Sequence, residues 1–214
     1  MSTKNYRNKY LMIGVLLLVT LAGMITWQVG IVYECEPLPI DLAIQNLALS
    51  LRSEALNLVM TTITHTADTK TIVAFCAILV VLPTRKKYGI PVTLAALGGL
   101  SIYKPMKHLF LRQRPDVALH LVEQGGYSFP SGHSVTSVVV YGLLLYLIQK
   151  HCKNPVAKSI LSVICLVLAL TVGPSRVYVG VHWPTDVMAG WVIGLAVVLL
   201  SIFVLEWLEK RKER

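Results

Sequence analysis

Stretches of apolar residues long enough to cross a membrane recur along this chain and restrict its possible folds more than any other feature. They cover residues 10–32, 88–106, 132–147, 157–173 and 185–205, with a shorter stretch at 72–83. A helix that crosses a bilayer needs about 20 predominantly apolar residues. The composition agrees, because 55% of the residues are hydrophobic and 14% are charged, against about 25% charged in a typical soluble domain. We therefore expect an all-α, polytopic membrane protein.

The basic residues are concentrated beside the apolar stretches. Thirteen of the 20 lysines and arginines fall in four clusters, namely Lys4/Arg7/Lys9, Arg85/Lys86/Lys87, Lys150/Lys153/Lys158 and Lys210/Arg211/Lys212/Arg214. Such clusters mark the cytoplasmic ends of membrane helices. The net charge of +9 is therefore a signal of topology, and since no nucleic-acid-binding motif accompanies it, no nucleic-acid partner is expected. We predict six transmembrane helices, with both termini in the cytoplasm.

The segment between the first and third crossings is the hardest to assign. In residues 34–52 apolar residues recur at helical spacing, with polar residues off that stripe, which predicts an interfacial amphipathic helix. The stripe is formed by Ile40, Ile44, Leu47 and Leu51, and the polar residues are Asp41, Gln45 and Arg52. The second crossing, around 72–83, is too short alone, so the polar stretch 61–70 must supply its first turns. We expect His65 and Asp68 to lie at the interface or to cap this helix, with Asp68 the candidate N-cap; the alternative is that both belong to a site.

Three short motifs in the second half of the chain carry chemically active residues. They are Lys107-x6-Arg114-Pro115, Pro130-Ser131-Gly132-His133 and Ser175-Arg176-x5-His182-x3-Asp186. With six crossings that begin in the cytoplasm, the loop after the third helix and the loop after the fifth both fall on the extracytoplasmic side. All three motifs lie in or beside those two loops. The charge pattern therefore predicts one site on one face of the membrane.

The first motif supplies cations at the end of a helix. Lys107 lies near the carboxyl end of the third apolar helix, where the helix dipole favours a positive charge. Arg114 follows in a chain that Pro115 has turned out of helical conformation. Both side chains can reach a common anion. For Lys104 and Arg112, which lie nearby, we expect contact with lipid headgroups.

The second and third motifs place polar groups at the starts of helices. Ser131 is a good N-cap, and Gly132 lets backbone N–H groups approach an anion at a helix N-terminus. His133 follows in the first turn. Arg176 adds a guanidinium, whose planar fork suits phosphate oxygens.

A histidine and a carboxylate form the end of the third motif. Their spacing of four puts His182 and Asp186 on the same side, about one helical turn apart. The carboxylate can fix the proton on one ring nitrogen and leave the other free as a nucleophile. Residues of these types can hold a phosphate, attack it and release its leaving group.

Together the motifs resemble the signature of the type 2 phosphatidic acid phosphatase family, also called lipid phosphate phosphatases. The match covers residues 107–186 without departure. It implies a helical core like that of acid phosphatases and vanadium haloperoxidases, in a single integral-membrane lipid phosphatase domain over 1–214. The short outer loops resemble those of bacterial phosphatidylglycerophosphatase B and undecaprenyl diphosphate phosphatases. The family is metal-independent, so neither a metal nor a cofactor is expected.

The resemblance also implies a role for each motif residue. His182 would be the nucleophile that forms a phosphohistidine, Asp186 would orient it, and His133 would protonate the leaving oxygen and then activate water. The phosphate oxygens would be held by the remaining motif residues, Lys107, Arg114, Arg176, Ser131 and Gly132. The predicted substrate is a lipid phosphate monoester or diphosphate in the plasma membrane, reached from the extracytoplasmic face.

Other functions use the same signature. A lipid phosphotransferase, a lipid A type phosphatase and a non-catalytic phospholipid-binding protein remain alternatives, and the sequence selects neither the substrate nor the oligomeric state. The cysteines give no metal-ligand spacing and no disulfide framework. Cys76 and Cys165 stand in apolar stretches and are expected to be packing residues, whereas Cys35 and Cys152 lie in loops.

Overall fold

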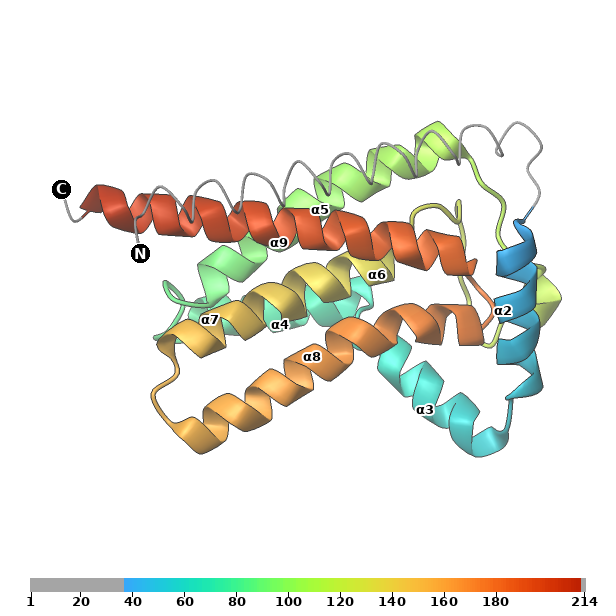
Figure 1. Ribbon diagram of the computed structural model, residues 1–214, viewed down its shortest axis with the longest axis horizontal. Coiled ribbons are helices and arrows are strands. Elements are labelled where there is room, and N and C mark those ends of the chain that lie inside the picture. Colours follow the sequence, from blue (N-terminus) through green and yellow to red (C-terminus); the bar gives the residue numbers. More distant parts are fainter. Residues whose placement is uncertain (1–36, 213–214) are drawn as a thin grey trace.

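The computed structural model describes residues 37–212, and every regular element in that range is a helix (Figure 1). In chain order these are α2 (Pro39–Ser50), α3 (Glu54–His65), α4 (Thr69–Val81), α5 (Gly89–Phe110), the 3₁₀ helix η1 (Val117–Leu119), α6 (Gly132–Ser137), the π-helix η2 (Val138–Gly142), α7 (Leu143–His151), α8 (Pro155–Tyr178) and α9 (Pro184–Lys212). The predicted all-α class is confirmed. The predicted first crossing, 10–32, and Cys35 lie outside the described residues.

Local capping signals set several of the helix boundaries. Ser53 accepts a hydrogen bond from the N–H of Leu56 at 3.3 Å and so caps α3. Asn154 does the same for α8, which then begins with Pro155, a residue well suited to the first helical position. At the carboxyl end of α5 the chain leaves the helix at Leu111, whose φ of 49° lies in the left-handed region.

Within residues 37–212, three continuous helical segments are long and apolar enough to cross a membrane. They are Gly132–His151, which joins α6, η2 and α7, then Pro155–Tyr178 and Pro184–Lys212. The pair α3 and α4, bent by 52° at the break between them, adds a fourth crossing if it counts as one span. Large apolar side chains such as Val163 and Leu170 on α8 point outward and are exposed, as expected for a surface that faces lipid. The chain is a membrane protein, and the total of six crossings stays a prediction.

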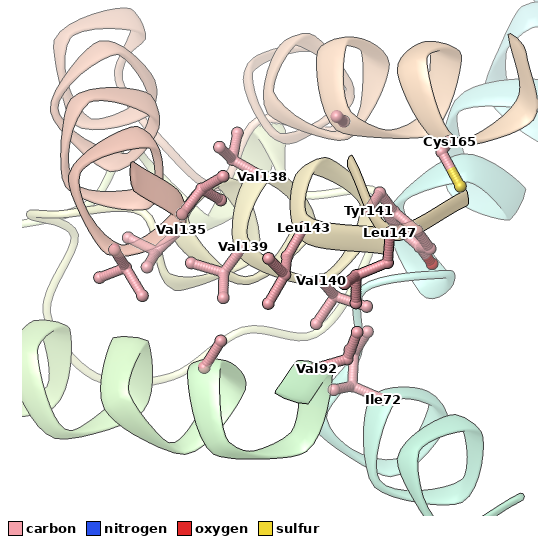
Figure 2. Packing of buried hydrophobic residues seen from close by; sticks show 14 of the residues in the cluster. Ile72, Val92, Val135, Val138, Val139, Val140, Tyr141, Leu143, Leu147 and Cys165 are labelled. Atoms are coloured by element: carbon pink, nitrogen blue, oxygen red, sulfur yellow. The ribbon is translucent and has the colours of Figure 1, made fainter. Parts of the chain in front are cut away.

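The segment made of α6, η2 and α7 lies at the centre of the bundle (Figure 1). Its Val139 and Leu143 are fully buried and belong to one apolar cluster with Val92 of α5 (Figure 2). Cys76 and Cys165 belong to the same cluster, so the prediction that they are packing residues is confirmed. The first turn of α6 is thereby fixed against its neighbours, and that turn carries the second motif.

The two ends of the bundle differ in chemistry. The α5–α6 and α8–α9 connections, which carry the motifs, lie at the same end as α2 (Figure 1). At the opposite end the rings of Tyr88 and His151 meet edge to face, with centroids 6.0 Å apart, and Lys150 forms an ion pair with Glu209 at 2.5 Å. The described basic residues at 85–87, 150–158 and 210–212 therefore lie at the end opposite the motifs, as the charge pattern predicts.

The predicted amphipathic segment forms α2, but its polar side faces the protein. Asp41 and Gln45 are buried, whereas Ile40, Leu47 and other members of the apolar stripe are exposed. This orientation leaves an apolar surface outward at the end of the bundle, which suits an element lying in the membrane interface. It also turns Asp41 toward the motif residues.

Candidate active site

Helix ends from distant parts of the chain bring the three motifs together. The last turn of α5 carries Lys107, and the segment that follows it carries Arg114. The first turn of α6 carries His133, and the last turn of α8 carries Arg176. His182 lies just before α9. Each functional side chain therefore sits at or beside a helix end, where backbone groups unused by the helix can also face an anion.

A cavity of about 470 Å³ opens where these ends meet. Five of the eight predicted site residues line it, namely Lys107, Arg114, Gly132, His133 and His182. Most of the remaining wall is apolar and comes from α4 and α5, including Ile72, Val73, Ala77, Val80, Ala96, Leu97 and Leu100. The other predicted residues, Ser131, Arg176 and Asp186, are buried and do not line the cavity. The cavity thus has a polar end and an apolar body.

His182 is held in one tautomer by its neighbours. Its Nε2 lies 3.1 Å from Nη1 of Arg114, and its Nδ1 lies 3.4 Å from Oδ2 of Asp186. Because a guanidinium can only donate, Nε2 is the acceptor and the ring proton is on Nδ1, facing the carboxylate. Burial lowers the pKa of His182 well below its ordinary value, and the Arg114 cation adds to this effect. The side chain is therefore a neutral imidazole, and the lone pair on its Nε2 accepts the hydrogen bond from Arg114.

The carboxylate of Asp186 is hydrogen-bonded on both oxygens. Oδ2 accepts from the hydroxyl of Ser128 at 2.5 Å and from the N–H of Trp183 at 2.9 Å. Oδ1 accepts from Nη1 of Arg112 at 2.6 Å. A buried carboxylate costs free energy unless such donors surround it, and here they also fix its rotation relative to His182.

Lys107 and Arg114 bind carbonyl oxygens of the loop before α6, and Arg114 also binds one in the connection before α9. Lys107 Nζ donates to the carbonyl of Tyr127 at 2.7 Å, and Arg114 donates to the carbonyls of Gly126 at 2.8 Å and Val181 at 2.6 Å. Burial lowers the pKa of Arg114 to about 10, so its guanidinium stays charged at neutral pH. Burial and the neighbouring Arg114 cation lower the pKa of Lys107 to about 7. Both basic side chains of the first motif are thereby held at the cavity that His182 also lines.

His133 meets a carboxylate that was expected to serve another purpose. Asp68 stands at the N-cap position of α4 but makes no capping hydrogen bond. Its Oδ1 lies 2.9 Å from Nε2 of His133, and its Oδ2 lies 2.7 Å from Nδ1 of His65. Asp68 takes the predicted N-cap position, but its side chain does not cap the helix. It contacts a motif residue instead, which agrees with the alternative that Asp68 belongs to a site.

The start of α6 is tightly packed. Ser131 caps the helix, since its Oγ accepts from the N–H of Ser134 at 3.4 Å. At Gly132 a Cβ atom would lie 2.8 Å from the ring of Tyr103, so only glycine fits without a shift. The N-cap predicted for Ser131 is confirmed, and the Gly132 backbone reaches the cavity wall.

Arg176 lies behind the cavity wall and is almost completely buried. Its Nη1 donates to Oγ1 of Thr64 at 2.7 Å, and its Nη2 donates to Oε1 of Gln124, a residue that lines the cavity. The structure therefore brings Arg176 close to the motif cluster, with one polar side chain between it and the cavity.

Four site residues were missed or misassigned from the sequence. Arg112 is buried between Asp186 and Asp41, with N–O distances of 2.6 Å to each, so the expectation of headgroup contact is wrong. The others are Asp41, which was assigned to the polar side of an interfacial helix, Asp68, which was assigned to the helix cap, and Ser128, which no sequence pattern marks. Arg112 does stand two residues before Arg114, but one-dimensional spacing does not show which of two neighbouring arginines turns inward.

Within residues 37–212, no group of three His, Cys, Asp or Glu side chains is arranged to hold a metal ion. The polar groups that line the cavity are instead basic side chains, imidazoles, an amide and hydroxyls. This donor set is suited to an anion.

Comparisons with known proteins agree with this geometry. Residues 87–210 match the family model of the PAP2 superfamily. Phosphatidylglycerophosphatase B of Bacillus subtilis is 36% identical over 164 residues, which cover 75% of this chain and 80% of that protein. An undecaprenyl-diphosphatase of Sulfolobus acidocaldarius is 34% identical over 131 residues, 59% of each protein.

A solved structure extends the likeness to the fold. The crystal structure of the transmembrane PAP2 type phosphatidylglycerolphosphate phosphatase from Bacillus subtilis aligns with a TM-score of 0.72 and 30% identity, over 87% of this chain and 96% of that one. The predicted enzyme class, a phosphatase acting on phosphate esters, is confirmed at this level. The chain belongs to the PAP2 superfamily, the family that its three motifs predicted.

Proposed function

We propose that this protein is a membrane-embedded phosphatase that hydrolyses a lipid phosphate monoester or diphosphate through a phosphohistidine formed at His182. The observation that carries the proposal is the cavity, which joins the cationic motif end to an apolar body between α4 and α5. An anionic headgroup with an apolar tail matches both parts. The volume of the cavity, about 470 Å³, also lies in the usual range for ligand sites, about 300–1,000 Å³.

In the first step His182 attacks phosphorus. The lone pair on Nε2 forms the N–P bond while the bond from phosphorus to the leaving oxygen breaks. His133, which shares the cavity wall with His182, delivers a proton to that oxygen, and such general-acid help typically contributes about 10² to 10⁴ in rate. Asp186 faces the Nδ1 proton and stabilises the positive charge that the ring gains.

In the second step water frees the phosphate. His133, now neutral, takes a proton from a water molecule whose oxygen attacks phosphorus, and the N–P bond breaks with its electron pair returning to Nε2 of His182. Both histidines end in their starting states, so the cycle is balanced: lipid phosphate and water become lipid alcohol and inorganic phosphate. With a lipid diphosphate the leaving group is the lipid monophosphate.

Charge on the transferring group is met by fixed cations and dipoles. Lys107 and Arg114 line the cavity beside His182, and Arg176 reaches the phosphate by exchanging its contact with Gln124. The Gly132 N–H at the start of α6 and the Ser131 hydroxyl complete the set. Preorganised donors of this kind are usually the largest single contribution to such a reaction.

The membrane arrangement belongs to the same proposal. The charge pattern favours six crossings in one domain over 1–214, with both termini in the cytoplasm and the site on the extracytoplasmic face of the plasma membrane. In support, the α4–α5 and α7–α8 connections and the carboxyl end of α9, which carry the described basic clusters, lie at the end of the bundle opposite the α5–α6 and α8–α9 connections (Figure 1). Headgroups would then be reached from outside the cytoplasm.

Phosphate release from the detergent-solubilised protein tests the proposal. Phosphatidylglycerophosphate, phosphatidic acid and undecaprenyl diphosphate are assayed side by side, because the names of the relatives support both monoesters and diphosphates. We expect wild type to release phosphate from at least one of them, and His182→Ala to release none. His151→Ala removes a histidine at the opposite end of the bundle and is the matched control, with activity like wild type.

Rapid quenching with ³²P-labelled phosphatidic acid tests the intermediate. Wild type should retain acid-labile label on the protein, and His182→Ala should retain none. If wild type and His182→Ala release equal amounts of phosphate from every lipid, the protein is not this enzyme, and a phospholipid-binding role takes its place.

A further inference from the structure

Three charged side chains from distant segments form a buried chain behind His182. Asp41 of α2, Arg112 after α5 and Asp186 of α9 have exposed fractions of 0%, 4% and 0%. Arg112 donates through Nη2 to Oδ2 of Asp41 and through Nη1 to Oδ1 of Asp186, each at 2.6 Å. One guanidinium fork therefore bridges two carboxylates.

In this bridge the two oxygens of the Asp186 carboxylate have different partners. Oδ1 is taken by Arg112, which leaves Oδ2 on the side of His182 Nδ1. A guanidinium is planar and presents its N–H groups in a rigid fork, so a bond to Oδ1 restricts rotation of the whole carboxylate. The direction in which Oδ2 faces the histidine is thus set from behind.

Asp41 in turn holds both Arg112 and the start of α9. Its Oδ1 accepts from the N–H of Thr185 at 2.9 Å, and its Oδ2 accepts from the Thr185 hydroxyl at 3.0 Å. The same hydroxyl accepts from Nη1 of Arg112 at 2.8 Å. A residue of the interfacial helix α2 is therefore built into the frame of the motif residue Asp186.

Stability alone gives a poor reason for this arrangement. Burying charges is expensive, and replacing a buried ion pair by apolar residues of similar volume is often neutral or stabilising. In this structure the buried pair fixes the orientation of Asp186, the carboxylate beside the proposed nucleophile.

We propose that Arg112 and Asp41 are positioning residues that act through Asp186 to orient His182. The inference rests on the proposed role of His182. It assigns to α2, which lies outside the three motifs and outside the matched family region, a direct part in the reaction.

Steady-state kinetics on phosphatidic acid in detergent micelles tests the inference with Arg112→Gln and Asp41→Asn. Misplacing a reacting group by about 1 Å can cost about 10²-fold in rate, so we expect kcat to fall by about that factor for Arg112→Gln and by less for Asp41→Asn. KM should stay unchanged, because Lys107 and Arg114 still hold the phosphate. Arg112→Lys keeps the charge without the fork and should recover only part of the loss.

A matched control lies on the same face of the same helix. Gln45 is buried one turn after Asp41, and its side-chain amide has no hydrogen-bond partner among the described residues. Gln45→Leu should therefore leave kcat and KM unchanged. Thermal unfolding followed by tryptophan fluorescence shows that each variant is folded.

The decisive measurement is a double-mutant cycle that combines each variant with Asp186→Asn. Residues that act as one unit are strongly non-additive, so Arg112→Gln and Asp41→Asn should cost little further activity in the Asp186→Asn background. A merely structural role would cost the same factor in both backgrounds, and that result overturns the inference. Wild-type kcat in both single variants overturns it as well. If wild type releases no more phosphate than His182→Ala, the proposed function itself has failed, which is a separate result.

Discussion

Gly132→Ala should lower the activity of the protein through a steric contact with one aromatic ring. The new Cβ would lie 2.8 Å from Cε2 and 3.1 Å from Cζ of Tyr103. Carbon atoms in ordinary contact are about 3.5–4.0 Å apart. The ring or the first turn of α6 must therefore move by about 0.7 Å or more, and Tyr103 is itself buried in the apolar cluster.

The displacement falls on the helix start that carries His133 and the Gly132 N–H. Since a shift of about 1 Å at a reacting group can cost about 10²-fold, we expect kcat on phosphatidic acid to fall by about 10- to 10²-fold. Gly98→Ala is the matched control. Nothing lies within 4 Å of a Cβ at Gly98, so that variant should keep wild-type kcat and gain about 0.5–1 kcal/mol of stability from the better helix former.

A second substitution separates the contact from any general damage. Tyr103→Leu removes the ring, so adding it to Gly132→Ala should recover most of the lost kcat relative to Tyr103→Leu alone. Tyr103→Phe keeps the ring and should recover nothing. The reasoning is refuted if Gly132→Ala has wild-type kcat, or if Tyr103→Leu and Tyr103→Phe behave alike in the double variants.

Three further predictions concern packing, the cavity and pH. Gly190→Ala places a Cβ 2.7 Å from Cβ of Ser134, so it should lower stability by about 1–3 kcal/mol, seen as a lower Tm; an unchanged Tm would contradict the tight contact of α6 with α9. Ala96→Phe fills the apolar body of the cavity and should reduce turnover of long-chain phosphatidic acid while sparing a short-chain phosphate monoester; equal loss on both would argue against a tail site. Because burial lowers the pKa of His182, the imidazole stays neutral and reactive as pH falls below about 6.5, so its protonation should not limit kcat/KM there. Arg114, with its pKa lowered to about 10, loses its charge above that value, so KM should rise as pH passes 10.

Features set by neighbours in the chain could be predicted from the sequence. The apolar stretches after residue 88 became α5, the α6–α7 segment, α8 and α9, because length and hydropathy are local properties. Ser131 caps α6 as its residue type indicates. The spacing of four between His182 and Asp186 put the two side chains together, since they lie within one turn.

Features that depend on long-range contacts could not be predicted from the sequence. Asp68 reads as an ordinary N-cap, yet its carboxylate binds His133, 65 residues away. In the same way, the segment that forms α2 was predicted only as an interfacial amphipathic helix. Its Asp41 turns inward and binds an arginine 71 residues later in the chain. No local pattern distinguishes these outcomes.

The sequence by itself determined the class of fold, the described helix segments after residue 88 and which residues are proposed to handle phosphate, because hydropathy, capping and motif spacing act over one or two helical turns. Only the tertiary structure decided which cation supports Asp186, which carboxylate meets His133 and where the apolar body of the cavity lies. Those choices follow from how helix ends far apart in the chain pack together, where burying a charge requires a partner that only the assembled bundle provides.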